Sequence, residues 1–107
     1  MSATCTVDCN IYESVHVLKD WYVYIVRCAD DSLYTGVTTD INRRLYEHNN
    51  TLKGAKYTKS RRPVKVVYIS SPVTRSEALK KEYAMKKKTK KMKETFLIEY
   101  GIINDNV

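Results

Sequence analysis

Two basic side chains fall on the apolar side of a short predicted helix. Its positions i, i+3, i+4 and i+7 are Ile41, Arg44, Leu45 and His48, the spacing of a buried stripe. An arginine and a histidine four residues apart on such a stripe need an anion or an acid to meet. Two interpretations stay open. Either both bind an anion, or the arginine extends to solvent at the core edge and the histidine bonds a carbonyl. Arg43 and Glu47, on the other side of the helix, can face solvent.

A single carboxylate breaks the apolar pattern of a later predicted helix, which opens with the capping box Thr-Arg-Ser-Glu. Its apolar stripe is Ala78, Leu79, Glu82, Tyr83 and Met85. Glu82 either pairs with a base such as Lys86 or ligates a cation. Because Mg²⁺ is often held by one carboxylate and water in phosphate chemistry, a single acid is sufficient for the second interpretation.

Tyrosines occupy both strands of a predicted β-hairpin, with Tyr22 and Tyr24 in the first strand and Tyr34 in the second. Side chains alternate along a strand, so the length of the turn decides which of them share a face. An odd turn places Tyr34 opposite Cys28 and puts Tyr24 and Tyr34 on one face; an even turn separates them. The alternative to a chemical role is that these tyrosines only pack.

The elements that must position these residues follow the order ββαβαα. Runs of β-branched and aromatic residues predict strands at 21–28, 33–37 and 64–69, and capped periodic segments predict helices at 41–49, 74–88 and 89–100. Thr39 or Asp40 is expected to cap the first helix and Gly101 to end the last, while residues 51–63 form a basic loop. The predicted fold class is α/β (α+β): a small three-stranded antiparallel sheet flanked by three helices.

The positive charge is concentrated in one stretch of the chain. The net charge is +7, but residues 53–93 contain fifteen bases and only two acids, Glu77 and Glu82, a net charge of +13. Such a block points to a polyanionic partner such as nucleic acid. A merely solvated face is the alternative.

A chain of 107 residues accommodates one domain, here predicted as an N-terminal extension (1–20), a folded domain (21–101) and a tail (102–107). No apolar run approaches ~18 residues, and the acidic first twenty residues do not resemble a secretory signal. Three cysteines, Cys5, Cys9 and Cys28, are expected to be free thiols of an intracellular protein, cytoplasmic or nuclear. The alternative, a zinc site using Cys5, Cys9 and His16, lacks a fourth ligand.

In combination, these residues resemble the GIY-YIG nuclease domain. Tyr22-Val23-Tyr24 and Tyr34-Thr35-Gly36 correspond to its two motifs, and Arg44, His48 and Glu82 follow in the family's order. The resemblance covers about residues 21–100. It is closest to small stand-alone members, in which a tyrosine replaces the first motif's glycine and a threonine the second motif's aliphatic residue. The chain is also similar to the structure-specific nucleases that share this domain.

The resemblance implies metal-dependent hydrolysis of phosphodiester bonds in structured or damaged DNA, in repair or recombination. The implied site residues are Tyr24, Tyr34, Arg44, His48, Glu82 and Gly36. A tyrosine acts on the attacking water, the arginine stabilises charge on the scissile phosphate and the histidine assists proton transfer. The glutamate holds one divalent ion, Mg²⁺ or Mn²⁺, and the glycine permits close approach. A non-catalytic nucleic-acid-binding module on the same scaffold is the alternative.

Under this interpretation the basic block forms a DNA-contacting surface. The expected contacts are Lys53, Lys56, Lys59, Arg61, Arg62, Lys86, Lys87 and Lys90. They would meet mainly the DNA backbone, so binding is expected to be weakly sequence-specific. Tyr57 is a candidate for stacking on an unpaired base, with packing within the fold as the favoured alternative. A protein partner is the expected source of targeting, and no membrane partner is expected.

Overall fold

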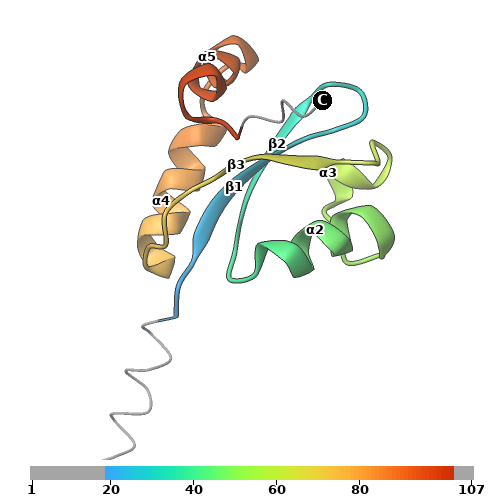
Figure 1. Ribbon diagram of the computed structural model, residues 1–107, viewed down its shortest axis with the longest axis horizontal. Helices are drawn as coiled ribbons and strands as arrows, with labels where there is room; N and C mark the ends of the chain where they lie inside the picture. Colours follow the sequence, from blue (N-terminus) through green and yellow to red (C-terminus); the bar gives the residue numbers. More distant parts are fainter. Residues whose placement is uncertain (1–18, 103–107) are drawn as a thin grey trace, which may run out of the picture.

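The computed structural model describes residues 19–102 as a three-stranded sheet with four helices (Figure 1). In chain order the elements are β1 (Tyr22–Arg27), β2 (Leu33–Thr38), α2 (Ile41–Asn50), α3 (Lys56–Lys59), β3 (Lys65–Ile69), α4 (Arg75–Lys86) and α5 (Lys90–Tyr100). The predicted fold class is confirmed. The predictions for residues 1–18 and for the tail beyond 102 lie outside the described residues. They include the alternative of a zinc site with Cys5, Cys9 and His16. No described helix is long and apolar enough to cross a membrane.

The structure has one helix more than the three predicted, because the basic loop contains the single helical turn α3. The Thr58 amide and hydroxyl both bond to the carbonyl of Ala55, at 3.1 and 2.9 Å. A single turn is too short to produce a periodic pattern of apolar residues. Sequence reasoning therefore had no signal for this element.

The sheet has the order β2-β1-β3 and is antiparallel throughout. Tyr24 lies opposite Gly36, and Tyr34 lies opposite Val26. All four residues therefore share one face, as predicted for an odd turn. The expected pairing of Tyr34 with Cys28 is wrong by two residues, because Cys28 instead donates its amide to Ser32 inside the turn.

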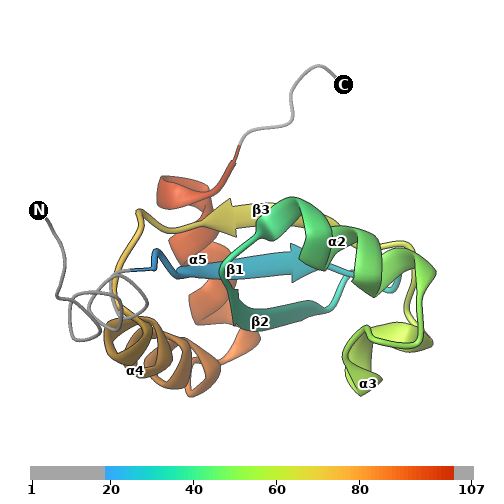
Figure 2. The same ribbon diagram turned by 90° about the horizontal axis from the view of Figure 1, so that it is seen from below.

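The two faces of the sheet carry separate cores. On one face Tyr24, Val26 and Val64 pack with Ile41 and Leu45 of α2. On the other face the core consists of Ile25, Val67, Met85, Phe96 and Leu97. Figures 1 and 2 show α2 on one side of the sheet and α5 on the other, with α4 along the β2 edge. α2 thereby brings its site residues to the Tyr24 face of the sheet, and α4 brings Glu82 to the β2 edge, near enough to Tyr24 to act on its charge.

The helix ends follow the predicted caps. Asp40 accepts from the Arg43 amide at the start of α2, a capping box opens α4 at Thr74, and Thr89 caps α5. Gly101 is the C-cap of α5. These local interactions fix where each helix begins, and so which of its side chains face the sheet.

The apolar stripe predicted for α4 is wrong in part. Ala78 and Met85 are buried, but Leu79 and Tyr83 are 37% and 64% exposed. Because α4 runs along the β2 edge, its buried face is narrow, and Glu82 rather than Tyr83 borders it. The predicted position of Glu82 on the inward side is retained, with 19% of its side chain exposed.

Candidate active site

Tyr24 lies at the centre of the sheet face that α2 covers. It is 1% exposed, and its hydroxyl lies 2.8 Å from Nε2 of His48. A Cβ atom on Gly36 would lie 2.5 Å from that hydroxyl and 2.7 Å from the ring carbon that carries it. The glycine of the second motif is therefore needed so that the phenol can cross the neighbouring strand.

His48 comes from the last turn of α2 and is fully buried. Its Nδ1 lies 2.9 Å from the Thr58 hydroxyl, so both ring nitrogens have side-chain partners, and neither bonds the carbonyl that one interpretation expected. Burial and the charge of Arg44 lower the pKa of His48 to about 4. The imidazole is thus neutral at physiological pH.

Burial likewise keeps Tyr24 neutral. It raises the pKa of the phenol to about 12, although the positive charge of Arg44 favours the phenolate. The negative charge of Glu82 adds to the rise. Arg44 and Glu82 are therefore both near enough to Tyr24 to act on its charge.

Arg44 lies at the edge of the core, with 23% of its side chain exposed. Its Nη1 donates to Oε1 of Glu47 and to the carbonyl of Lys53, each at 2.9 Å. The prediction that Glu47 can face solvent is wrong, because this ion pair leaves only 17% of its side chain exposed. Two protons of the guanidinium are used within the fold, and Arg44 also faces the Tyr24 hydroxyl, whose pKa burial raises and Arg44 lowers in part. The donors that remain can meet an anion.

Tyr34 borders the same region. Its ring meets the His48 ring edge-on at 5.6 Å and stacks on Tyr57 at 6.0 Å. Nζ of Lys86 lies 5.7 Å from the centre of the Tyr34 ring. Within residues 19–102 the Tyr34 hydroxyl makes no hydrogen bond, so it can take a water or a substrate oxygen.

Glu82 is the carboxylate that could hold a metal ion. Its Oε2 pairs with Nζ of Lys86 at 3.3 Å, as one interpretation predicted. Residues 19–102 contain no cluster of three His, Cys, Asp or Glu side chains that would form a metal cage. A partly buried carboxylate that already faces a cation nevertheless fits a Mg²⁺ or Mn²⁺ ion completed by water and substrate phosphate. The ion and Lys86 would compete for the same oxygen.

Comparison with known proteins identifies the family of the domain that carries these residues. The model of the GIY-YIG catalytic domain matches residues 20–95. The chain belongs to the GIY-YIG family. Membership implies nuclease-type activity and confirms the resemblance noted in the sequence.

The similar proteins are small members of the same group. A UPF0213 protein of Desulfotalea psychrophila is 56% identical over 77 residues, which are 72% of this chain and 70% of the relative. One from Haloquadratum walsbyi is 49% identical over 83 residues, 78% of this chain and 92% of the relative. The solution NMR structure of a protein of E. faecalis has a TM-score of 0.53 at 46% identity, over 75% of this chain and 84% of that one.

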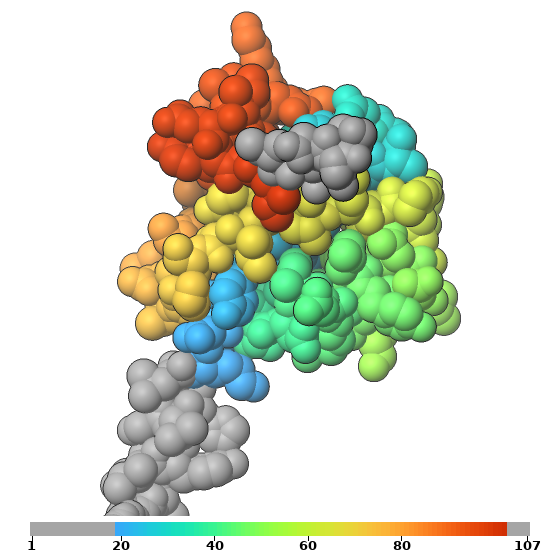
Figure 3. Space-filling model, in the orientation of Figure 1, coloured from blue at the N-terminus to red at the C-terminus, as the bar shows by residue number. Residues whose placement is uncertain are grey.

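The basic residues around the GIY-YIG site fall into two groups. Lys53, Lys56 and Lys59 are exposed on the segment between α2 and β3, which lies with α2 on one side of β3 in the space-filling view (Figure 3). The others have intramolecular partners: Arg61 pairs with Asp30, Arg62 donates to the carbonyls of His48 and Thr51, Lys86 pairs with Glu82, Lys87 lies over the Tyr83 ring and Lys90 pairs with Glu94. Only the first group is wholly available to a ligand.

Of two further residues of the GIY-YIG site, the sequence did not indicate Thr58, whereas packing was the favoured alternative for Tyr57. Thr58 is fully buried against His48, and a threonine in a basic loop gave no sign of this. Tyr57 stacks on Tyr34 and carries the Arg61 guanidinium 4.0 Å from its ring centre. Its ring is thus occupied within the fold rather than free for an unpaired base.

Proposed function

We propose that this GIY-YIG domain is a divalent-metal-dependent endonuclease that hydrolyses phosphodiester bonds in structured or damaged DNA, within the cell's repair or recombination processes. The observation that carries the proposal is the gathering of an imidazole, a guanidinium and a carboxylate around the buried phenol of Tyr24. Tyr24, His48, Arg44 and Glu82 come from three different elements. Apolar packing alone does not explain why these polar groups lie together, because burying polar groups is costly.

The Tyr24–His48 pair supports the activation of a water molecule. As the water oxygen bonds to phosphorus, a proton of the water passes to the phenol oxygen and the phenol proton passes to Nε2 of His48. The bond to the leaving oxygen breaks, and that oxygen takes a proton from solvent. The phosphodiester is thereby exchanged for a phosphomonoester and a hydroxyl.

The order of these proton transfers follows from burial. Burial raises the pKa of Tyr24 to about 12 and lowers the pKa of His48 to about 4, so both groups are neutral before the reaction. Because burial disfavours the charged forms of both groups, a separated phenolate and imidazolium carry an energetic cost, and the transfer to His48 accompanies the attack. Positive charge from Arg44 favours the developing phenolate, so it lowers this cost.

Arg44 is suited to the scissile phosphate. The Glu47 and Lys53 contacts hold its guanidinium in place, and the remaining N–H groups form a planar donor set that matches phosphate oxygens better than a lysine would. An ion held by Glu82 would supply Lewis-acid stabilisation of the charge on the phosphate. Contacts of Lys53, Lys56 and Lys59 with backbone phosphates support binding without sequence selection.

The test is cleavage of labelled duplex, nicked, flapped and branched DNA with Mg²⁺, and with EDTA as control. Wild type is expected to cut at least one structured substrate, and Arg44→Ala and Glu82→Ala are expected to lose about 100-fold or more in rate. Cleavage by wild type that is unaffected by EDTA would contradict metal dependence. Cleavage only of plain duplex would contradict the proposed substrate class.

One observation favours the alternative, a non-catalytic nucleic-acid-binding module. The Glu82 carboxylate is already paired with Lys86, and a protein that never binds a metal could keep that pair permanently. If wild type cuts no better than Glu82→Ala while both bind DNA equally, the binding module is the correct assignment.

A further inference from the structure

The hydroxyl of Thr58 sits between two groups that settle its orientation. Its side chain is fully buried, with Oγ1 2.9 Å from Nδ1 of His48 and 2.9 Å from the carbonyl oxygen of Ala55. A carbonyl oxygen only accepts hydrogen bonds. The single hydroxyl proton therefore points to Ala55, and a lone pair of Oγ1 points to the imidazole.

This orientation determines which ring nitrogen carries the proton. If Oγ1 accepts, Nδ1 of His48 must be the donor, so Nε2 of the neutral ring keeps its lone pair. The reverse arrangement would turn lone pairs of Oγ1 and the Ala55 oxygen toward each other at 2.9 Å. Electrostatic repulsion between two oxygens at that distance disfavours it.

The tautomer of His48 also determines the direction of its hydrogen bond with Tyr24. The lone pair of Nε2 lies 2.8 Å from the phenol oxygen, so the phenol is the donor. In the other tautomer Nε2 would present a proton to the phenol, and the Tyr24 proton would lose its acceptor among the described residues. A histidine in that tautomer cannot receive a proton from Tyr24 at Nε2.

We propose that Thr58 is a positioning residue that holds His48 in the Nδ1–H tautomer and thereby makes Nε2 the proton acceptor for Tyr24. Thr58 touches neither substrate nor metal ion; it acts through His48. The effect on cleavage rests on the proposed nuclease function. The tautomer of His48 does not depend on that function, so the tautomer assignment and the nuclease function can fail separately.

Nitrogen NMR of the histidine rings tests the tautomer in the full chain. The second histidine, His16, is removed from the spectrum by His16→Gln. Wild type and Thr58→Ser are expected to show a protonated Nδ1 and an unprotonated Nε2. Thr58→Val keeps the shape and removes the acceptor for Nδ1–H, and Thr58→Ala is a second variant in case the valine variant does not fold. Because Tyr24 still favours a free Nε2 lone pair, these variants are expected to show a mixture that includes the Nε2–H tautomer, which wild type lacks.

A matched control is available in the sheet. Thr35 is also buried, but its hydroxyl has no hydrogen-bond partner in the described part of the chain. Thr35→Val therefore removes a buried hydroxyl without removing a contact, and its His48 spectrum is expected to equal that of wild type.

Single-turnover cleavage supplies the second readout. Thr58→Val and Thr58→Ala are expected to cut about 10- to 100-fold more slowly with unchanged DNA binding, and Thr58→Ser to recover to within about threefold of wild type. An Nε2–H tautomer in wild type, or a tautomer population in Thr58→Val and Thr58→Ala that is unchanged from wild type, would overturn the proposal. The expected spectra together with no cleavage by any form would support the tautomer assignment and contradict the nuclease function instead.

Discussion

At Tyr24 three constraints meet: the strand that carries it, the glycine opposite it and the histidine that binds its hydroxyl. Each of them has a different cause. Strand alternation turns the ring to the α2 face, the missing Cβ of Gly36 makes room for it, and the length of α2 brings His48 to its hydroxyl. These three geometric requirements explain why Tyr24, Gly36 and His48 occur at their particular spacing in the sequence.

Gly36→Ala tests the second constraint. The added Cβ would lie 2.5 Å from the Tyr24 hydroxyl, so the buried ring must move away from His48. We expect a loss of about 1–3 kcal/mol in stability from overpacking and a fall in cleavage rate of about 100-fold from misplacement. Urea unfolding and single-turnover kinetics measure the two effects. A variant that folds and cuts like wild type would show that Tyr24 does not need its present position.

Several site residues could be predicted one by one because they violate a simple pattern. Arg44, His48 and Glu82 are polar residues at apolar positions of helices, and periodicity alone singles them out. Their partners could not be found in this way. Contact between Thr58 and His48 depends on where a one-turn helix folds back, and no local pattern in the sequence encodes that distance.

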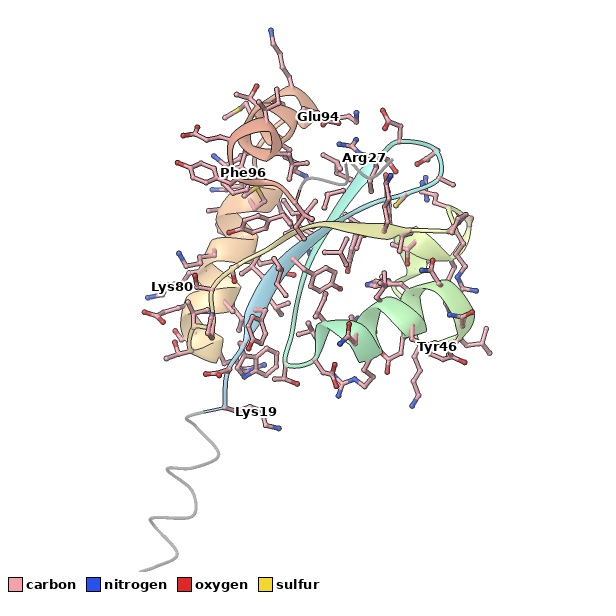
Figure 4. All side chains as sticks on the ribbon, in the orientation of Figure 1. Lys19, Arg27, Tyr46, Lys80, Glu94 and Phe96 are labelled. Carbon is pink, nitrogen blue, oxygen red and sulfur yellow. The ribbon has the colours of Figure 1, made fainter. Side chains whose placement is uncertain are left out.

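Among the elements, α5 is joined to the end of β1 by an ion pair. Arg27 donates two hydrogen bonds of 2.8 Å to the carboxylate of Glu94, which also pairs with Lys90 at 2.9 Å. Figure 4 shows Arg27 and Glu94 side by side across the gap between the two elements. The contact fixes α5 against the sheet beside the packed ring of Phe96.

This ion pair predicts a dependence of stability on pH. Hydrogen bonds from Arg27 and then Lys90 lower the pKa of Glu94 to about 2. A lowered folded-state pKa stabilises the fold above the unfolded-state value of ~4.3, and that contribution is lost as the pH falls toward 2. With a third of the side chain exposed, we expect Glu94→Gln to cost about 1 kcal/mol at pH 7.

Urea unfolding at a series of pH values measures this contribution. The difference between wild type and Glu94→Gln is expected to shrink as the pH falls below about 4. Glu99→Gln is the matched control, because Glu99 is an exposed acid on the same helix, and its effect is expected to be near zero. A difference that stays constant down to pH 2 would contradict the assignment to this ion pair.

The elements themselves were the most predictable part of the molecule. Caps at Asp40, Thr74 and Thr89 mark the helix starts in the sequence as in the structure. The burial of α4 was less predictable. A helix that lies along a sheet edge buries a narrower stripe than periodicity indicates, which is why Leu79 and Tyr83 are exposed.

For the whole molecule, the positive charge is not one uniform surface. Residues 53–93 contain fifteen bases, but several are held by acids or carbonyls, as described for Arg61, Arg62 and Lys90. The lysines between α2 and β3 have no such partners in the described residues. Lys80, by contrast, extends from α4 away from the sheet (Figure 4).

DNA binding should therefore depend more on the lysines between α2 and β3 than on the lysines of α4. Replacing Lys53, Lys56 and Lys59 together by glutamine is expected to weaken binding and to reduce the dependence of log K on log salt by about three, at ~0.9 per phosphate contact. The pair Lys80→Gln and Lys81→Gln should leave that dependence unchanged. Fluorescence anisotropy from low to moderate salt measures both. Equal slopes for the triple variant and wild type would contradict a DNA surface on this loop.

The proposed nuclease activity requires that Glu82 serves catalysis and is not simply one more charge on the fold. Single-turnover cleavage at saturating DNA and Mg²⁺ tests it most directly, with Glu77→Gln as the matched control. Glu77 is the other acid of the basic block, lies on the same helix and serves the capping box of α4, in which glutamine is also accepted. Glu82→Gln is expected to bind DNA and unfold like wild type but to cut about 100-fold more slowly, while Glu77→Gln cuts within about twofold of wild type. Cleavage by Glu82→Gln at the wild-type rate would contradict the account.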